Sequence, residues 1–133
     1  MRDAVDVTNV LFVCVQNAGR SQIAQRLHEL AGGSARSAGS QPAERVHANV
    51  AAVFPELASR TPRALSHDDV EWADVVVTMG CGDACPYMPG KRYVDWDLPD
   101  PAGGTDDDVR ALADEIQRRL DALPTLSRSE SCP

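Results

Sequence analysis

The sequence has few aromatic residues, no surplus of positive charge and no long apolar run. Only 5% of its 133 residues are aromatic, so we expect a core built mainly from valine, leucine, isoleucine and alanine. Acidic residues outnumber basic ones by 20 to 13, and the resulting net charge of −7 argues against general nucleic-acid binding. No segment approaches the roughly 18 apolar residues of a membrane span, and the first residues lack a secretory signal. We therefore expect a soluble, cytoplasmic protein.

Cysteines are also few, and they are unevenly spaced: Cys14, Cys81, Cys85 and Cys132. In a reducing compartment such residues are more often catalytic, metal-binding or inert than members of a disulfide framework. Only Cys81 and Cys85 are close in sequence, so a zinc site made from two tight pairs is not available. Composition thus leaves a small enzyme or binding module in which cysteine chemistry is open.

No internal repeat, low-complexity block or flexible linker divides the chain, which predicts one domain over residues 1–133. Residues 1–8 and 126–133 are expected to be mobile tails, and Cys132 in the second tail has no expected catalytic role.

Four segments have the composition of strands. Val10–Val15 and Asp74–Met79 are continuous apolar runs rich in β-branched residues, typical of strands buried on both faces. Ala35–Ala38 predicts a further short strand, and Lys91–Trp96 predicts an edge or terminal strand.

Helical patterns separate these strands. Apolar spacing predicts one helix that stops at Gly32-Gly33, a second over Glu44–Leu57 that Pro55 ends or kinks early, and a third capped by Thr105. The alternation predicts an α/β fold, a single three-layer domain with a four-stranded parallel sheet covered by helices on both faces.

The loop between the first strand and the first helix, here called the anion loop, contains Cys14, Val15, Gln16, Asn17, Ala18, Gly19, Arg20 and Ser21. A loop at the carboxyl end of a parallel strand that leads into a helix presents backbone N–H groups and a positive dipole end, which favours oxyanion binding. Arg20 adds a planar fork of donors for two oxyanion oxygens. The same field would favour the thiolate of Cys14, to which Ser21 could donate. Asn17 tolerates left-handed geometry, and Gly19 permits close approach to a ligand.

A buried structural cysteine beside a surface arginine is the simple alternative. However, the C-x5-R-S pattern at this strand–helix junction resembles the low-molecular-weight protein tyrosine phosphatase superfamily. Asp100-Pro101, within WDLPDPAGG, is similar to the Asp-Pro loop of that superfamily. The resemblance implies that Asp100 is the general acid that protonates the oxygen leaving when Cys14 attacks. Asp95 and Asp97 are nearby candidates outside the Asp-Pro pair.

Within the superfamily, the sequence resembles arsenate reductases more than phosphatases. Gln16 and Gly19 replace a glycine and a cysteine of the phosphatase pattern, and small residues follow Asp100-Pro101 where phosphatases have aromatic ones. The segments CVQNAGRSQIA, TMGCGDACP and DWDLPDPAGG look like arsenate reductases. This resemblance implies reduction of arsenate to arsenite in arsenic detoxification, with phosphate or sulfate as competing oxyanions.

The resemblance also implies a second thiol that attacks the Cys14–arsenic adduct. In a thioredoxin-coupled branch, Cys81 would resolve Cys14 and Cys85 would then resolve Cys81. In a mycothiol/mycoredoxin-coupled branch, a small thiol attacks instead, and an inert pair is the third alternative for these cysteines. No tightly bound cofactor is expected beyond this external reductant.

Some members of the thioredoxin-coupled branch bind potassium through acidic side chains beside the loop. The matching positions here look like Gln25 and Arg63, so no metal ion is expected. The histidines fit surface or loop positions better than ligand positions: His28, His47 and His67. Two other functions stay open, a low-molecular-weight tyrosine phosphatase and a phosphate-binding or redox-sensing module.

Overall fold

The computed structural model describes residues 8–80 and 88–123. Cys81, Cys85 and Cys132 therefore lie outside the described residues. Four strands form one parallel sheet in the order β2-β1-β3-β4: β1 (Asn9–Cys14), β2 (Ser34–Gly39), β3 (Val75–Met79) and β4 (Arg92–Asp95). The predicted α/β class and the predicted edge position of the last strand are confirmed.

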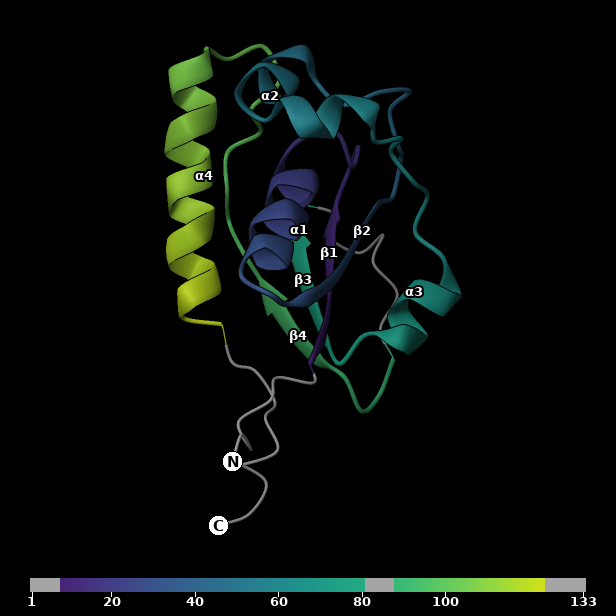
Figure 1. Cartoon of the computed structure of the whole chain (residues 1–133). Helices are drawn as coiled ribbons and strands as arrows, with labels where there is room; N and C mark the ends of the chain where they lie inside the picture. The colour runs from purple at the N-terminus through teal and green to yellow at the C-terminus, as the bar shows by residue number, and fades with distance from the viewer. Residues whose placement is uncertain (1–7, 81–87, 124–133) are drawn as a thin grey trace.

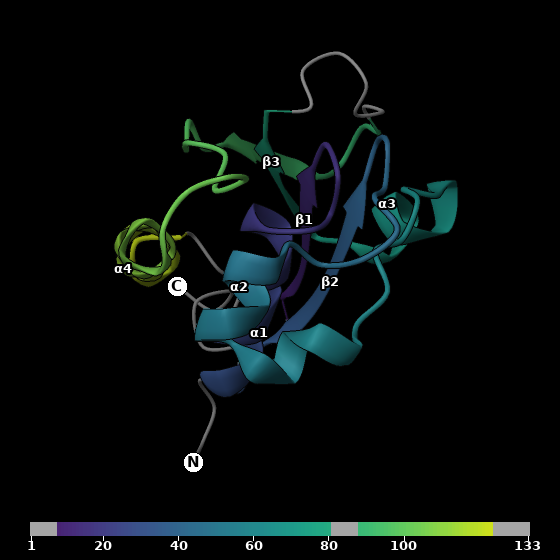
Figure 2. The same ribbon diagram turned by 90° about the horizontal axis from the view of Figure 1, so that it is seen from above.

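Helices cover both faces of the sheet (Figures 1 and 2). The first face carries α1 (Arg20–Leu30), α2 (Ala48–Val53), the 3-10 helix η1 (Pro55–Ser59) and α4 (Asp106–Asp121). The short helix α3 (His67–Trp72) covers the opposite face. None of the helices in the two described stretches has the length and apolar character that a membrane crossing requires.

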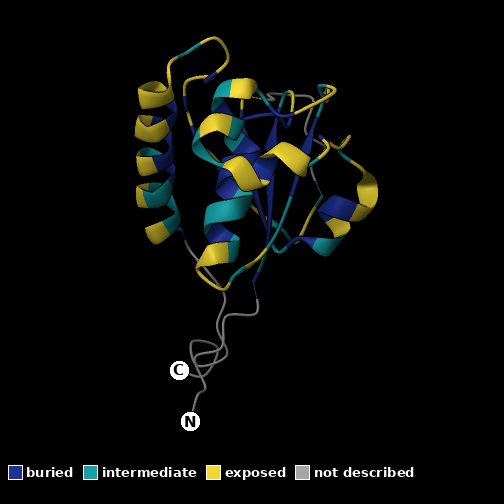
Figure 3. Cartoon of the chain, turned by 45° about the horizontal axis from the view of Figure 1, so that its top comes forward, coloured by how far each residue is buried: buried dark blue, intermediate teal, exposed yellow. Residues whose placement is uncertain are grey.

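Alternation along the strands divides the core in two. Val10 and Phe12 of β1 belong to the larger apolar cluster beneath α1, α2 and α4, whereas Leu11 and Val13 belong to a smaller cluster beneath α3. All four side chains are fully buried, which confirms the prediction of a strand covered on both faces. Figure 3 shows that α4 has a buried side, which faces the rest of the protein, and an exposed side, which faces outward.

One expected helix boundary was wrong. The helix predicted over Glu44–Leu57 begins only at Ala48. It ends at Val53, before Pro55, which agrees with the prediction that Pro55 ends it early, and Pro55 then opens the 3-10 helix. Proline suits this first position because the N–H that it lacks would have no helical partner there. The six-residue α3 was not predicted, because so short a helix has too few apolar residues to show a period.

The termini of the other helices follow their sequence signals. Thr105 accepts a hydrogen bond from the Asp108 N–H, and the Asp108 side chain accepts one from the Thr105 N–H, so the predicted capping box is present on α4. The first helix ends at Leu30, before Gly32 with its φ of +89°.

Two placements differ from expectation. His28 is buried on α1, where its ring meets the edge of Phe12 with centroids 5.9 Å apart, so its expected surface or loop position was wrong. Thr8, expected in a tail, is also buried.

The carboxyl ends of the strands meet at one edge of the sheet. Cys14 at the end of β1 pairs with Gly39 of β2 on one side and with Met79 of β3 on the other. The segment between β4 and α4 rises to the same end of the molecule (Figure 1). This topology brings the anion loop and the Asp-Pro loop together.

Candidate active site

Cys14 is buried, with 2% of its surface exposed, and it lies where β1 gives way to the anion loop. Its Sγ is 2.9 Å from Ser21 Oγ and accepts a hydrogen bond of 3.3 Å from the backbone N–H of Asn17. Asn17 has φ of +51°, the left-handed geometry expected at this position. The tight loop therefore aims a donor at the sulfur just before α1 begins at Arg20.

The side chain of Asn17 fixes the direction of the Ser21 hydroxyl. Asn17 Nδ2 donates to Ser21 Oγ at 2.7 Å, which occupies a lone pair of that oxygen. The Ser21 hydrogen is then available for Cys14 Sγ, and Ser21 is the donor in this contact whenever the sulfur is a thiolate, which can only accept. Gln22 Nε2 and the backbone N–H of Arg63 both donate to Asn17 Oδ1, which holds the buried amide in this orientation.

Backbone hydrogen bonds to the segment after β2 occupy the carbonyl groups of the anion loop. The carbonyl oxygens of Cys14, Val15, Gln16 and Ala18 accept bonds of 2.7–3.2 Å from N–H groups of residues 40–47, the segment after β2. With these carbonyls engaged elsewhere, the positive start of α1 dominates the field at the loop. The arrangement suits a tetrahedral oxyanion.

Arg20 joins the anion loop to the Asp-Pro loop. Its side chain is 12% exposed, its Nη1 donates to the Leu98 carbonyl at 3.3 Å, and its Nη2 lies 3.8 Å from Asp100 Oδ2. A Cβ at Gly80 would lie 3.1 Å from Arg20 Nη1, and Gly80 has φ of +89°. Glycine at position 80 thus leaves space for the guanidinium.

Asp100 is the carboxylate that the structure places beside Arg20. Its side chain is 51% exposed, and its Oδ1 accepts a hydrogen bond from the Ala102 N–H at 3.0 Å. Asp95 Oδ1 instead accepts a bond from Thr78 at the edge of the sheet, and Asp97 is exposed in the connection that follows β4. The geometry therefore favours Asp100 among the three candidate acids.

Gly19 lies directly against Pro101 of the Asp-Pro loop. A Cβ built on Gly19 would lie 2.7 Å from Pro101 Cγ, a distance that real Cβ atoms essentially never show. Glycine at this position lets the buried Pro101 ring lie directly on the anion loop.

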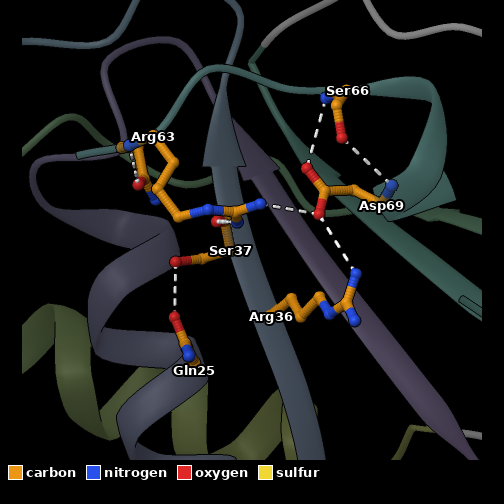
Figure 4. A network of polar contacts seen from close by, with 7 residues as sticks. Gln25, Arg36, Ser37, Arg63, Ser66 and Asp69 are labelled. Carbon is orange, nitrogen blue, oxygen red and sulfur yellow. Dashed lines mark hydrogen bonds and ion pairs between the residues drawn. The ribbon is translucent and has the colours of Figure 1, made fainter. Parts of the chain in front are cut away.

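A network of charged side chains is joined to the anion loop through Arg63 (Figure 4). Asp69 is 1% exposed, and its Oδ1 accepts hydrogen bonds from Arg63 Nη2 at 2.7 Å and Arg36 Nη1 at 3.4 Å. Arg63 Nη1 also donates to the Ser37 carbonyl of β2 at 2.6 Å. The backbone N–H of Arg63 donates to Asn17 Oδ1, and the backbone N–H of Asn17 donates to Cys14 Sγ. The network is therefore linked to the sulfur through Asn17.

Burial would raise the pKa of the Asp69 carboxyl, but hydrogen bonds from Arg63 and Ser66 outweigh it and hold that pKa below its ordinary value. Asp69 is therefore a carboxylate at neutral pH. The two positions considered for potassium also belong to this region: Arg63 pairs with Asp69, and Gln25 Oε1 accepts a bond from Ser37 Oγ at 2.6 Å. In this region the guanidinium of Arg63 supplies a positive charge that pairs with the Asp69 carboxylate.

Comparisons with known proteins show the family and the fold of this chain. The sequence profile described as "Low molecular weight phosphotyrosine protein phosphatase" matches residues 9–130. A Halobacterium salinarum protein named as an arsenate reductase is 38% identical over 129 residues, which cover 88% of this chain and 91% of the relative.

A solved structure and a second relative extend the comparison. The thioredoxin-dependent arsenate reductase of Corynebacterium glutamicum superimposes with a TM-score of 0.73 at 39% identity, covering 90% of this chain. The chain spans 63% of the length of that protein. A protein-arginine-phosphatase of Geobacillus stearothermophilus is 31% identical over 144 residues, covering 91% of this chain and 97% of the relative.

Proposed function

Because this chain belongs to the low molecular weight phosphotyrosine protein phosphatase family, we propose that its anion loop binds arsenate and that its thiols reduce it to arsenite. The observation that supports this best is the convergence of Cys14, Arg20 and Asp100 at one edge of the sheet. The neighbours named as arsenate reductases favour arsenate as the oxyanion. Phosphate and sulfate share its tetrahedral shape and would compete.

In the first step, the Cys14 thiolate attacks arsenic and forms a sulfur–arsenic bond. One arsenate hydroxyl leaves as water after it takes a proton from Asp100, and Arg20 with the loop N–H groups holds the remaining oxygens. Ser21 and the Asn17 N–H stabilise the thiolate before attack through their contacts with Sγ.

In the second step, another thiolate attacks Cys14 Sγ. A disulfide forms, the sulfur–arsenic bond breaks, and its electron pair stays on arsenic, which leaves as arsenite. The two sulfurs have together lost two electrons, which an external dithiol must restore.

We assign the second and third thiols to Cys81 and Cys85. Both lie outside the described residues, so this assignment depends on the sequence and on the end of β3. Met79 pairs with Cys14, and the next residue, Gly80, lies against Arg20. Cys81 is the residue that follows in the sequence. Thioredoxin is the favoured reductant because the Corynebacterium neighbour is thioredoxin-dependent, with mycothiol and mycoredoxin as the alternative.

Arsenite release with each purified reductant system in turn tests the proposal. Sustained turnover with thioredoxin, thioredoxin reductase and NADPH is expected. Turnover that requires mycothiol and mycoredoxin, and that survives Cys81→Ser and Cys85→Ser, would replace the internal relay by a small-thiol route.

A phosphatase is the second candidate because one relative is a protein-arginine-phosphatase. Such an enzyme hydrolyses the Cys14 adduct with water and needs no second thiol. Absence of arsenite with both reductant systems, together with phosphate-ester or phosphoarginine hydrolysis by the Cys81→Ser, Cys85→Ser double variant, would establish this alternative.

A further inference from the structure

The Asp-Pro loop, residues 99–104, is held from the side of α2. Asn49, in the first turn of α2, donates through Nδ2 to the Pro101 carbonyl at 2.7 Å and to the Gly104 carbonyl at 3.2 Å. Pro101 is buried and would be only 2.7 Å from a Cβ at Gly19. The Asn49 side chain and the contact between Pro101 and Gly19 thus hold the Asp-Pro loop against the anion loop.

The opposite side of the Asp-Pro loop is open. A cavity of about 450 Å³ lies between it and α4, lined by Asp100 and Gly104 of the loop and by Asp108, Leu112 and Glu115 of the helix. Because the loop does not pack tightly on the helix that it leads into, the cavity leaves space into which Asp100 can move. The contacts that hold the loop therefore come from Asn49 of α2 and from Gly19 and Arg20 at the start of α1.

The start of α2 touches both loops. The His47 N–H donates to the Ala18 carbonyl of the anion loop at 2.9 Å, and Asn49, two residues later, donates to Pro101. A single short segment thus spans from the oxyanion-binding backbone to the loop that carries the acid.

We propose that Asn49 is a positioning residue for the general acid, which holds Asp100 near Arg20 while Gly19 lets Pro101 seat on the anion loop. This proposal rests on the proposed function, because it takes Asp100 as the proton donor. Without the Asn49 amide, the Pro101 and Gly104 carbonyls lose a common donor, and the loop shifts toward the cavity. Oxyanion binding by residues 14–21 is unaffected because Asn49 donates to none of them.

The test compares Asn49→Ala with Asn9→Ala. Asn9 is a matched control because its Nδ2 donates to a backbone carbonyl, that of Trp72, at 3.1 Å in a part of the fold outside both loops. Asn49→Ala should speed amide hydrogen exchange in residues 99–104 and slow single-turnover arsenite release by about tenfold, the scale of one or two lost hydrogen bonds. Phosphate affinity should stay within about twofold, and Asn9→Ala should change none of these quantities.

A second substitution and a double-mutant cycle separate positioning from a general loss of structure. Asn49→Asp keeps the size of the side chain but removes the donors, so it should slow release at least as much as Asn49→Ala. In an Asp100→Asn background, Asn49→Ala should have no further effect, because the proton donor is already absent.

Equal slowing by Asn49→Ala in both backgrounds, unchanged exchange in residues 99–104, or a parallel loss of phosphate affinity would each overturn the proposal. If the parent chain releases no arsenite, the proposed function fails, and hydrogen exchange alone decides the loop contact. Faster exchange over residues 99–104 in Asn49→Ala than in Asn9→Ala then supports it, and equal exchange rejects it.

Discussion

The two loops at the carboxyl edge of the sheet are built in opposite ways. In the anion loop, Cys14, Asn17 and Ser21 are 0–2% exposed and hydrogen-bonded to one another, with Arg63 donating from behind. In the Asp-Pro loop, the Asp100 side chain is 51% exposed, and the loop borders a cavity on its α4 side. The loop proposed to bind the oxyanion is therefore preorganised, whereas the loop proposed to supply a proton has space to move.

This contrast has a physical reason under the proposed mechanism. Binding an oxyanion needs donors fixed in advance, because a donor that must reorganise loses part of the energy that it supplies. A proton donor must instead approach an oxygen, release its proton and let the product leave. The variants below perturb one half at a time.

Removing the nucleophile should have the largest effect. Cys14→Ser should abolish arsenite release, because a serine hydroxyl stays protonated at neutral pH and its oxygen is a far weaker nucleophile than the cysteine sulfur. Phosphate binding, measured by calorimetry, should persist because Arg20 and the backbone of residues 14–21 remain. Arsenite production by Cys14→Ser would remove Cys14 from the role of nucleophile.

Removing the acid should slow the chemistry but not the binding. Asp100→Asn should reduce the single-turnover rate by about 10²–10⁴, the usual loss for a missing general acid. Phosphate affinity should not fall, since Asp100→Asn takes away no donor to the oxyanion and only removes a negative charge 3.8 Å from Arg20 Nη2. Asp97→Asn, a neighbouring exposed carboxylate, provides the control, and a larger loss in that variant would exchange the two roles.

Changing the arginine should weaken binding first. Arg20→Lys keeps the charge but loses the two-pronged geometry, so phosphate and arsenate affinities should fall about tenfold to a hundredfold. Competitive titrations with both oxyanions measure this effect, and Arg110→Lys on the exposed side of α4 serves as the control. Unchanged affinities would place Arg20 outside the binding site.

The supporting network should affect stability more than chemistry. Asp69→Asn weakens the pairing with Arg63 and Arg36 and should lower the free energy of unfolding by about 1–3 kcal/mol at pH 7. Because the pKa of Asp69 is lowered in the folded protein, its contribution is complete above the ordinary value of 3.8 and is lost as pH falls through the folded pKa.

Denaturant unfolding at pH 7, 5, 4 and 3 measures this difference, with Asp68→Asn as the neighbouring control. The gap between parent and Asp69→Asn should be constant from pH 7 to 5 and should shrink as the pH falls below about 4. A gap that stays constant down to pH 3 would mean that the charge of Asp69 does not stabilise the fold.

The position of the anion loop between a strand and a helix could be predicted because its parts are contiguous. Cys14, Asn17, Arg20 and Ser21 fall within eight residues, between a strand that is a continuous apolar run and a helix with apolar residues at helical spacing. The sheet was predictable for the same reason, since its two central strands are continuous apolar runs.

The supports of the two loops were not predictable in this way. Asn49 acts on Pro101 across 52 residues, and Arg63 acts on Asn17 across 46. Asn49 lies on α2, and Asp69, which pairs with Arg63, lies on α3; both helices are only six residues long. Asn49 belongs to no motif, and Asp69 belongs only to the local capping box that Ser66 forms at the start of α3, so only the fold reveals their distant partners.

The central claim is that the chain itself supplies two electrons to arsenate. The most direct test is to treat the fully reduced protein with arsenate, without added thiol, and to measure arsenite together with the disulfides in a proteolytic digest. We expect about one arsenite per chain with Cys81 joined to Cys85, and Cys85→Ser should trap Cys14 joined to Cys81. Absence of arsenite, with every cysteine still reduced and phosphate binding intact, would contradict the claim.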